Sequence, residues 1–222
     1  IWMYKPSTTE QRNVINVYEI ISKEFSDTRR SVWKGVQEFL DKLETKQTGI
    51  EIGCGNGKNM LFRNDLIMEG IDTCEGFIEI CKNKKLSVEK KNILDMENYE
   101  KKYDFAISIA VFHHICKEKN RLRALMNMIG LLREGGKGLL SVWSYEQDID
   151  SKKTFEIGDN MVKWHKRKKM ENGTQEFDIY DRYYYVYDRD TFYKYLLNCI
   201  EYIKIDKIFN EKGNWFCEFT KK

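Results

Sequence analysis

The sequence is poor in several features that would narrow its class at once. Among its 222 residues there is one proline, and 38 basic against 35 acidic residues give a formal net charge of only +3. Any nucleic-acid surface must therefore come from local clusters of basic residues, because the overall balance implies none. No apolar run approaches the ~20 residues that span a bilayer. A protein that crosses a membrane by helices is not expected.

Cysteine pairs with metal-ligand spacing are also missing. The six cysteines include no Cys-x-x-Cys pair, so neither a zinc site nor a disulfide framework is predicted. Reduced thiols favour an intracellular protein, which we expect in the cytoplasm, with the nucleus as an alternative, and Cys54 is expected to be a small buried residue. Because the sequence begins with Ile1, a targeting segment before it stays open.

The composition fits one globular domain over residues 1–222, with 41% apolar and 14% aromatic residues. Helices are expected at its N-terminal end, over 8–43. Ser7 and Glu10 have the spacing of a capping box, and apolar residues then recur at helical intervals. A second helix is predicted over 32–43.

Strand and helix signals alternate from residue 50 onward, which predicts a parallel sheet with helices on both faces. A helix over 191–197 is then followed by two strands with a short turn between them, which predicts an antiparallel hairpin. This α/β arrangement, mostly parallel with a C-terminal antiparallel hairpin, is the Rossmann-like outline of class I methyltransferases. The expected strands are 50–52, 66–72, 88–94, 104–110, 137–143, 202–209 and 214–219, and the intervening helices 58–62, 77–82 and 121–132.

One segment, over about 144–181, breaks this periodicity. It is dense in charge and contains the run H-K-R-K-K at 165–169. We expect a basic insertion over the carboxyl edge of the sheet. A run of this kind is most often a solvated face, and beside a nucleic-acid site it becomes a candidate phosphate contact.

The stretch G-I-E-I-G-C-G-N-G-K-N at 49–59 places glycines directly after a short apolar strand. Gly53, Gly55 and Gly57 permit a positive φ and close approach of a ligand to the backbone. Their G-x-G-x-G spacing fits neither the dinucleotide fingerprint G-x-G-x-x-G nor the Walker loop. We therefore predict S-adenosylmethionine as the cofactor.

Acidic and amide side chains near the strand ends agree with this cofactor. Glu51 can accept a bond from the cofactor's ammonium group or order the loop, and Asp72 can accept both ribose hydroxyls. The side-chain carbonyl of Asn92 can accept from the adenine amino group. Ile93 and Ala110 complete the expected cofactor contacts.

The fourth expected strand ends in S-I-A-V-F-H-H-I, residues 108–115. The sequence there lacks the D-P-P-Y clamp of base amino methylation and the Pro-Cys pair that attacks pyrimidine rings. Two of the three histidines stand there instead. We expect His113 to face the substrate in a catalytic role, and His114 to bond backbone and fix the loop beside the substrate.

Taken together, six motifs make the sequence resemble a known family. It is similar to the eukaryotic tRNA wobble-uridine carboxymethyl methyltransferases, which esterify 5-carboxymethyluridine in the anticodon loop. The resemblance covers nearly the whole chain. The motifs are F-S-D-T-R at 25–29, E-I-G-C-G-N-G-K at 51–58, D-F-A-I-S-I-A-V-F-H-H at 104–114, V-W-S-Y-E-Q at 142–147, R-Y-Y at 182–184 and G-N-W-F at 213–216.

The resemblance implies a carboxylate as the methyl acceptor. A carboxylate is ionised at neutral pH, since unperturbed values lie near ~4, so placement matters more than a base. Arg29 and Arg182 are suited to grip it in a fork. The aromatic and amide residues expected to hold the extruded base are Trp164, Tyr183, Asn214 and Trp215.

The resemblance also implies two partners, the tRNA anticodon loop and a small zinc-binding activator protein in a heterodimer. The third strand, which this topology leaves at the sheet edge, is open to strand addition by such a protein.

Departures from the family and rival functions keep alternatives open. V-K-W stands at 162–164 where the family has V-P-W, Lys34 follows Trp33 where a proline is usual, and Asn92 replaces an aspartate. A methyltransferase for a small carboxylic acid or quinone-like metabolite would use the same glycines and histidines. A non-catalytic methyltransferase-like scaffold is the third reading.

Overall fold

A computed structural model describes residues 3–147, 154–168 and 176–222 of the chain. Its centre is a sheet of seven strands in the order β3-β2-β1-β4-β5-β9-β8. The strands are β1 (Thr48–Ile52), β2 (Ile67–Asp72), β3 (Ser87–Lys90), β4 (Tyr103–Ile109), β5 (Leu132–Trp143), β8 (Ile203–Glu211) and β9 (Asn214–Lys221).

The predicted fold class is confirmed by the pairing of these strands. β3, β2, β1, β4 and β5 run parallel to their neighbours. β9 runs antiparallel to both β5 and β8, so the C-terminal hairpin lies where it was expected. Because a short turn joins β8 to β9, these two strands can pair only in the antiparallel direction.

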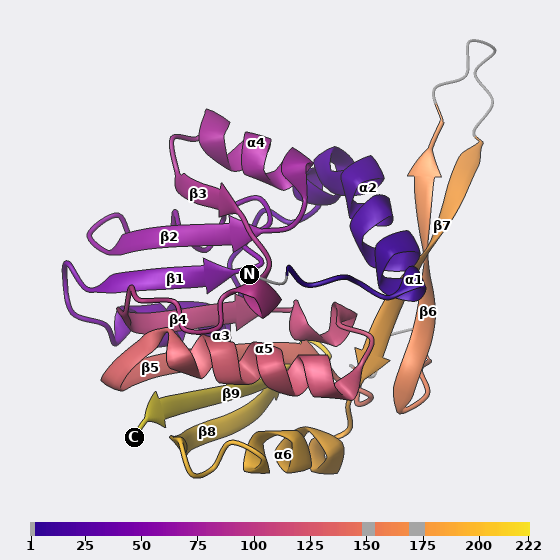
Figure 1. Cartoon of the computed structure of the whole chain (residues 1–222). Coiled ribbons are helices and arrows are strands. Elements are labelled where there is room, and N and C mark those ends of the chain that lie inside the picture. Colours follow the sequence, from indigo (N-terminus) through magenta and orange to yellow (C-terminus); the bar gives the residue numbers. More distant parts are fainter. Residues whose placement is uncertain (1–2, 148–153, 169–175) are drawn as a thin grey trace.

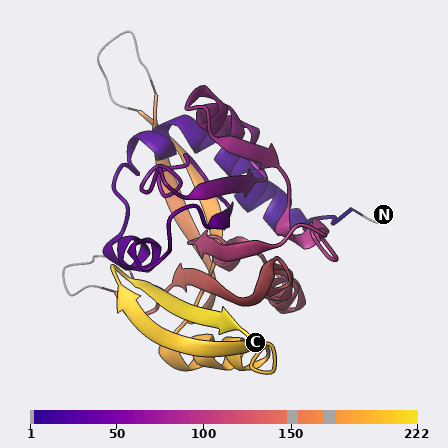
Figure 2. The same ribbon diagram turned by 90° about the vertical axis from the view of Figure 1, so that its left-hand side faces the viewer.

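Helices cover both faces of the sheet (Figure 1). On one face, α5 (Glu118–Gly130) and α6 (Arg189–Leu197) pack against apolar residues of the central strands. On the other, α3 (Lys34–Asp41) and α4 (Glu75–Asn83) cover a second apolar cluster. The turned view in Figure 2 shows the sheet twisting between these two layers.

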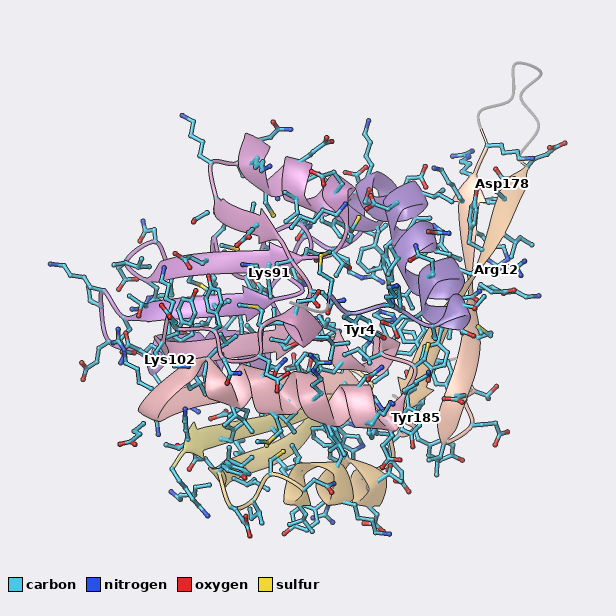
Figure 3. The ribbon with its side chains drawn as sticks, in the orientation of Figure 1. Tyr4, Arg12, Lys91, Lys102, Asp178 and Tyr185 are labelled. Atoms are coloured by element: carbon cyan, nitrogen blue, oxygen red, sulfur yellow. The ribbon has the colours of Figure 1, made fainter. Side chains whose placement is uncertain are left out.

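The N-terminal helical region has three parts, α1 (Thr8–Glu10), the π-helical turn η1 (Gln11–Ile15) and α2 (Asn16–Asp27). Ser7 caps it as predicted, since its hydroxyl accepts from the Glu10 backbone amide at 3.2 Å. The return bond of a capping box is not made, because the Glu10 carboxylate instead accepts from the Tyr4 hydroxyl at 2.9 Å. Figure 3 shows Tyr4 at the edge of the sheet where this region crosses it.

The segment expected as a basic insertion, over about 144–181, contains two strands that the sequence did not predict. β6 (Gly158–Arg167) and β7 (Phe177–Val186) form a separate two-stranded antiparallel sheet. Along β6, half-buried and exposed residues alternate because its inner face packs against the N-terminal helices. The hairpin stands across the carboxyl edge of the main sheet, beyond α1 and α2 (Figure 1), and Asp178 lies high on it (Figure 3).

Two shorter expectations also differ. Residues 58–62 form turns rather than a helix, and the strand expected over 88–94 ends at Lys90. A single 3₁₀ turn, η2 (Ile93–Asp95), follows it. Within the three described ranges, no helix is long and apolar enough to cross a bilayer.

Candidate active site

A cavity of about 210 Å³ lies at the carboxyl ends of β1, β2 and β4, under the N-terminal helices. Ligands of open α/β sheets bind at this edge. Both the glycine turn and the N-terminal region contribute to its wall, so residues far apart in the sequence meet there. Among the expected cofactor residues, those lining the cavity are Glu51, Gly53, Gly55, Asp72, Asn92, Ile93 and Ala110.

The glycine turn leaves no room for side chains at two of its positions. Gly53 has a φ of 71°, and a Cβ there would lie 2.4 Å from a methyl group of Val111. Gly57 has a φ of 72°, and its Cβ would lie 2.3 Å from Leu86. Glycine is therefore required at both positions. Gly57 supports the turn from behind and does not itself line the cavity.

Glu51 presents an unsatisfied carboxylate oxygen in this cavity. Its side chain is 1% exposed, and Oε1 accepts from Asn59 Nδ2 at 2.6 Å. Oε2 is buried with no partner. Burial raises the pKa of Glu51 to about 8. A buried carboxylate with a free oxygen is the group that an ammonium ion would satisfy.

Asp72 ties the end of β2 to the glycine turn. Its Oδ2 accepts from the Gly55 amide and its Oδ1 from the Cys74 amide, both at 2.9 Å. Burial raises the pKa of Asp72, although the hydrogen bonds from these backbone amides act to lower it. Each carboxylate oxygen keeps a further acceptor position, so the expected bonds to ribose hydroxyls remain available.

Asn92, Ile93 and Ala110 shape the other wall. The Asn92 side-chain carbonyl, expected to accept from adenine, accepts from the Leu94 amide at 3.0 Å and caps η2. Ala110 has a φ of 60°, a conformation rare in residues other than glycine. Its amide donates to Ser141 Oγ at 3.0 Å, which holds the end of β4.

Of the two histidines of the 3₁₀ turn η3 (Phe112–His114), His114 bonds backbone as expected, since its Nδ1 donates to the Tyr183 carbonyl at 2.8 Å. His114 lines the cavity, whereas His113 is 1% exposed behind it. His113 Nδ1 accepts from the Trp143 amide at 3.0 Å. Neighbours in a tight turn point in different directions, and His113, which we expected to face the substrate, is the one that does not line the cavity. Burial lowers the pKa of His113 and lowers that of His114 to about 3, so both are neutral at pH 7.

Arg29 lines the cavity at the end of α2. Its guanidinium lies 4.8 Å from the centre of the Phe25 ring and donates to Thr28 Oγ1 at 3.1 Å. The glycine turn holds its backbone, because Asn56 Nδ2 donates to the Arg29 carbonyl at 3.0 Å. Arg29 joins none of the ion pairs among the described residues.

Arg182 on β7 lies just behind the cavity wall and is 5% exposed. Nη1 donates to the Tyr184 hydroxyl at 2.8 Å, and the guanidinium lies 5.0 Å from the Trp164 ring centre. Nε is buried with no partner. No carboxylate in the part of the chain that the structure describes pairs with this cation.

The four residues expected to hold the base are divided among three places. Trp164 packs against Phe25 with ring centres 5.6 Å apart, and its indole nitrogen is buried without a partner. Tyr183 points to the other side of β7, where its hydroxyl donates to Asp159 at 2.6 Å. Asn214 and Trp215 lie at the start of β9, where Trp215 donates to Glu146 at 2.9 Å. None of the four lines the cavity.

Sequence reasoning missed Tyr18, Phe25 and Tyr184. Tyr18 and Phe25 line the cavity, although their spacing marked them as core residues of a helix. Tyr184 lies behind them, where it stacks on Trp143 with ring centres 3.9 Å apart and its hydroxyl lies 3.2 Å from that of Tyr18. Strand alternation was the available signal, because residues two apart share a face. Arg182 and Tyr184 therefore point together and Tyr183 points away.

Most of the basic run 165–169 lies on the hairpin, and two of its lysines contact other groups of this chain. Lys166 donates to the Ile20 carbonyl at 2.8 Å, and Lys168 lies 3.1 Å from Asp178. His165 and Arg167 are exposed on the opposite face, next to Lys163. Lys169 lies outside the described residues.

Known proteins match both the sequence and the fold. A family model described as a methyltransferase domain matches residues 25–197. An S-adenosylmethionine-dependent methyltransferase of Clostridium acetobutylicum superposes with a TM-score of 0.66 at 12% identity, covering 93% of this chain and 98% of that one. A glycopeptide N-methyltransferase in complex with S-adenosyl-L-homocysteine gives 0.62 at 11% identity, covering 85% and 86%. The fold and the glycine-lined cavity define a class I methyltransferase domain.

Curated relatives give the family. A tRNA (carboxymethyluridine(34)-5-O)-methyltransferase of Schizosaccharomyces pombe is 34% identical over 191 residues, which cover 80% of this chain and 83% of that protein. A protein of the same name from Macaca fascicularis is 34% identical over 76% of this chain. The chain spans about a quarter of the length of the vertebrate relatives that it matches. The chain belongs to the tRNA (carboxymethyluridine(34)-5-O)-methyltransferase family.

Proposed function

We propose that this protein transfers a methyl group from S-adenosylmethionine to the carboxylate of 5-carboxymethyluridine at the tRNA wobble position, forming the methyl ester. The names of its relatives, among them the proteins of Schizosaccharomyces pombe and Saccharomyces cerevisiae, support this substrate. The chemistry of the cavity wall supports it independently.

The residues around the glycine turn fit the cofactor. Glu51 Oε2, buried without a partner, suits the ammonium group, and Asp72 suits the ribose hydroxyls. At Gly55 nothing lies within 4 Å of the position of a Cβ, so the backbone there is open to the ligand. When bound there, S-adenosylmethionine supplies an electrophilic methyl group, and the chain's own residues must place the acceptor beside it.

The observation that carries the proposal is a pair of cations without carboxylate partners at one wall. Arg29 lines the cavity, and Arg182 is buried just behind it with a free Nε. Removing a charge from water costs several kcal/mol unless a partner compensates. A substrate carboxylate would compensate the buried Arg182 and could bind the half-buried Arg29, because a guanidinium grips a carboxylate through parallel hydrogen bonds.

Placement is then the main task of the protein in this reaction. The carboxylate is already ionised and needs no proton removed. Both histidines are neutral, and neither is required as a base. Arg29 orients the carboxylate, and the ring of Phe25, with Trp164 packed behind it, keeps water from that wall.

We also propose two partners and a location. The tRNA would cross the hairpin formed by β6 and β7, which carries the exposed basic residues. A small zinc-binding activator would pair with β3, which ends the sheet and is exposed along most of its length. The cytoplasm is the proposed location.

Methyl transfer to tRNA that carries 5-carboxymethyluridine tests the proposal, with and without the activator and with mass analysis of the nucleosides. We expect the methyl ester to appear at the wobble uridine. Transfer to small carboxylic acids but not to this tRNA would favour a metabolite substrate. Cofactor binding without transfer to either would favour a scaffold.

A further inference from the structure

A chain of hydrogen bonds joins Arg182 to His114 through two tyrosine hydroxyls. Arg182 Nη1 lies 2.8 Å from the Tyr184 hydroxyl, which lies 3.2 Å from the Tyr18 hydroxyl. The Tyr18 hydroxyl lies 3.0 Å from His114 Nε2. His114 Nδ1 lies 2.8 Å from the Tyr183 backbone carbonyl. The chain therefore links α2, η3 and β7.

The groups at the two ends of this hydrogen-bond chain have fixed roles as donor and acceptor. A guanidinium nitrogen can only donate, and a backbone carbonyl can only accept. Tyr184 must therefore accept from Arg182, and His114 must carry its proton on Nδ1 to donate to Tyr183. A neutral imidazole has one ring proton, so Nε2 of His114 can only accept.

The roles of the two hydroxyls follow from these ends. Since His114 Nε2 accepts, Tyr18 must donate to it. Tyr18 then accepts a hydrogen bond from Tyr184. The Tyr184 hydroxyl can donate this bond because its oxygen is the acceptor of the bond from Arg182. In this arrangement each of the four bonds has one donor and one acceptor.

A charged His114 would reverse part of the chain, and the surroundings oppose that state. The ring is buried beside the Arg182 guanidinium and next to His113, and no carboxylate in the described ranges pairs with it. Burial lowers the pKa of His114 to about 3, so the neutral ring prevails at pH 7.

His113 provides an internal contrast, because its Nδ1 accepts from the Trp143 amide at 3.0 Å. A neutral His113 must then carry its proton on Nε2, which is buried without a partner. The adjacent histidines are thus expected in opposite tautomers.

We propose that Tyr184 and Tyr18 are positioning residues, which form a one-way hydrogen-bond relay from Arg182 to His114 in the wall of the active site. Tyr184 holds Nη1 of Arg182 and leaves Nε free for a carboxylate. Tyr18 occupies the basic nitrogen of His114 and fastens α2 over the cavity. The positioning of a substrate carboxylate rests on the proposed function, whereas the proton order of the relay does not.

Nitrogen NMR of the full chain with ¹⁵N-labelled histidine tests the proton order, since it distinguishes protonated from bare ring nitrogens. His165→Gln removes the third histidine, which is exposed on the hairpin. At pH 7 we expect His114 as the Nδ1–H tautomer and His113 as the Nε2–H tautomer. An Nε2–H tautomer at His114, or a charged ring, would overturn the relay.

Two matched variants test each tyrosine. Tyr18→Phe should shift the His114 Nε2 signal to that of a nitrogen without a donor, whereas Tyr184→Phe should leave it in place. Both should lower kcat for methyl transfer about tenfold with S-adenosylmethionine affinity within about twofold, as expected when placement is lost. An unmoved His114 signal in Tyr18→Phe, or unchanged kcat in both variants, would overturn the proposal.

The tautomers are read in the unaltered protein, so they decide the proton order even if a variant does not fold. Absence of methyl transfer to tRNA by the unaltered protein would count against the proposed function alone. The relay would then stand or fall on the NMR result.

Discussion

The two sides of the active site differ in the kind of buried polar atom that they leave without a hydrogen-bond partner. At the glycine turn two buried acceptors lack a partner, Glu51 Oε2 and Asn59 Oδ1. At the hairpin side three buried donors lack a partner, the side-chain nitrogens of Arg182, His113 and Trp164. The fold thus presents a negative end and a positive end, which suit an ammonium group and a carboxylate.

A ligand with one group for each end accounts for two buried ionisable side chains, Glu51 and Arg182, in a fold that could stabilise itself with apolar residues. A buried group without a partner destabilises the folded state. Sites of this kind are expected where a ligand supplies the missing partner. If Glu51 and Arg182 serve ligands, their replacement should affect binding or turnover and spare the fold.

The largest effect is expected at Arg29, the cation that lines the cavity. Arg29→Met keeps the apolar stem and removes the fork, so kcat/KM for carboxymethyluridine should fall about 100-fold, the scale of lost charged hydrogen bonds. Arg29→Lys keeps the charge but loses the parallel donors and should also be slow. Cofactor affinity should survive in both. Full turnover of Arg29→Lys at saturating tRNA would make Arg29 a structural residue.

Glu51→Gln tests the negative end. It should weaken S-adenosylmethionine binding about tenfold, since one charged hydrogen bond is lost. The pKa of about 8 means that Glu51 is mostly protonated at pH 7 in the free protein, and the ammonium group favours the ionised form. Binding should therefore release a proton, measured by calorimetry in buffers of different ionisation enthalpy, and the variant should release none.

The same carboxyl predicts a pH dependence of stability without cofactor. The pKa of Glu51 in the folded state is raised above that in the unfolded chain. Its burial therefore does not lower the free energy of unfolding below about pH 4, the pKa in the unfolded chain. The destabilisation of the folded state grows as the pH rises and levels off above the pKa of about 8 in the folded state. Thermal unfolding from pH 5 to 9 should show this loss in the natural protein and a smaller loss in Glu51→Gln.

Arg182→Met should separate function from stability. Turnover should fall about tenfold because a buried cation near the carboxylate is lost, whereas the melting temperature should stay level or rise, because an unpaired buried charge is removed. A strong fall in melting temperature would instead assign Arg182 to the fold.

The smallest effect is expected from the outer face of the hairpin. Changing Lys163 and Arg167 to Gln should lower tRNA affinity a few-fold and reduce its salt dependence, because fewer counterions are released. Lys166 and Lys168, which contact groups of this chain, are the matched controls and should change the salt slope less. Equal slopes for both pairs would make this face a solvated surface.

The sequence predicted the main sheet well because its strands are buried between helices and read as apolar runs. The hairpin was missed since β6 and β7 pack against the N-terminal helices, a partner that local periodicity does not reveal. The tight turn at 112–114 hid which histidine faces the cavity. The relay was beyond reach, because Tyr18, His114 and Tyr184 meet only in the fold.

The most direct test of the two-ended site is binding of two anticodon stem-loops that differ only in the wobble side chain. One carries the carboxymethyl group and the other its uncharged amide. With S-adenosyl-L-homocysteine present, the natural protein should bind the carboxylate form more tightly, and Arg29→Met should bind both alike. Equal binding of the two stem-loops by the natural protein would contradict a carboxylate end in this cavity.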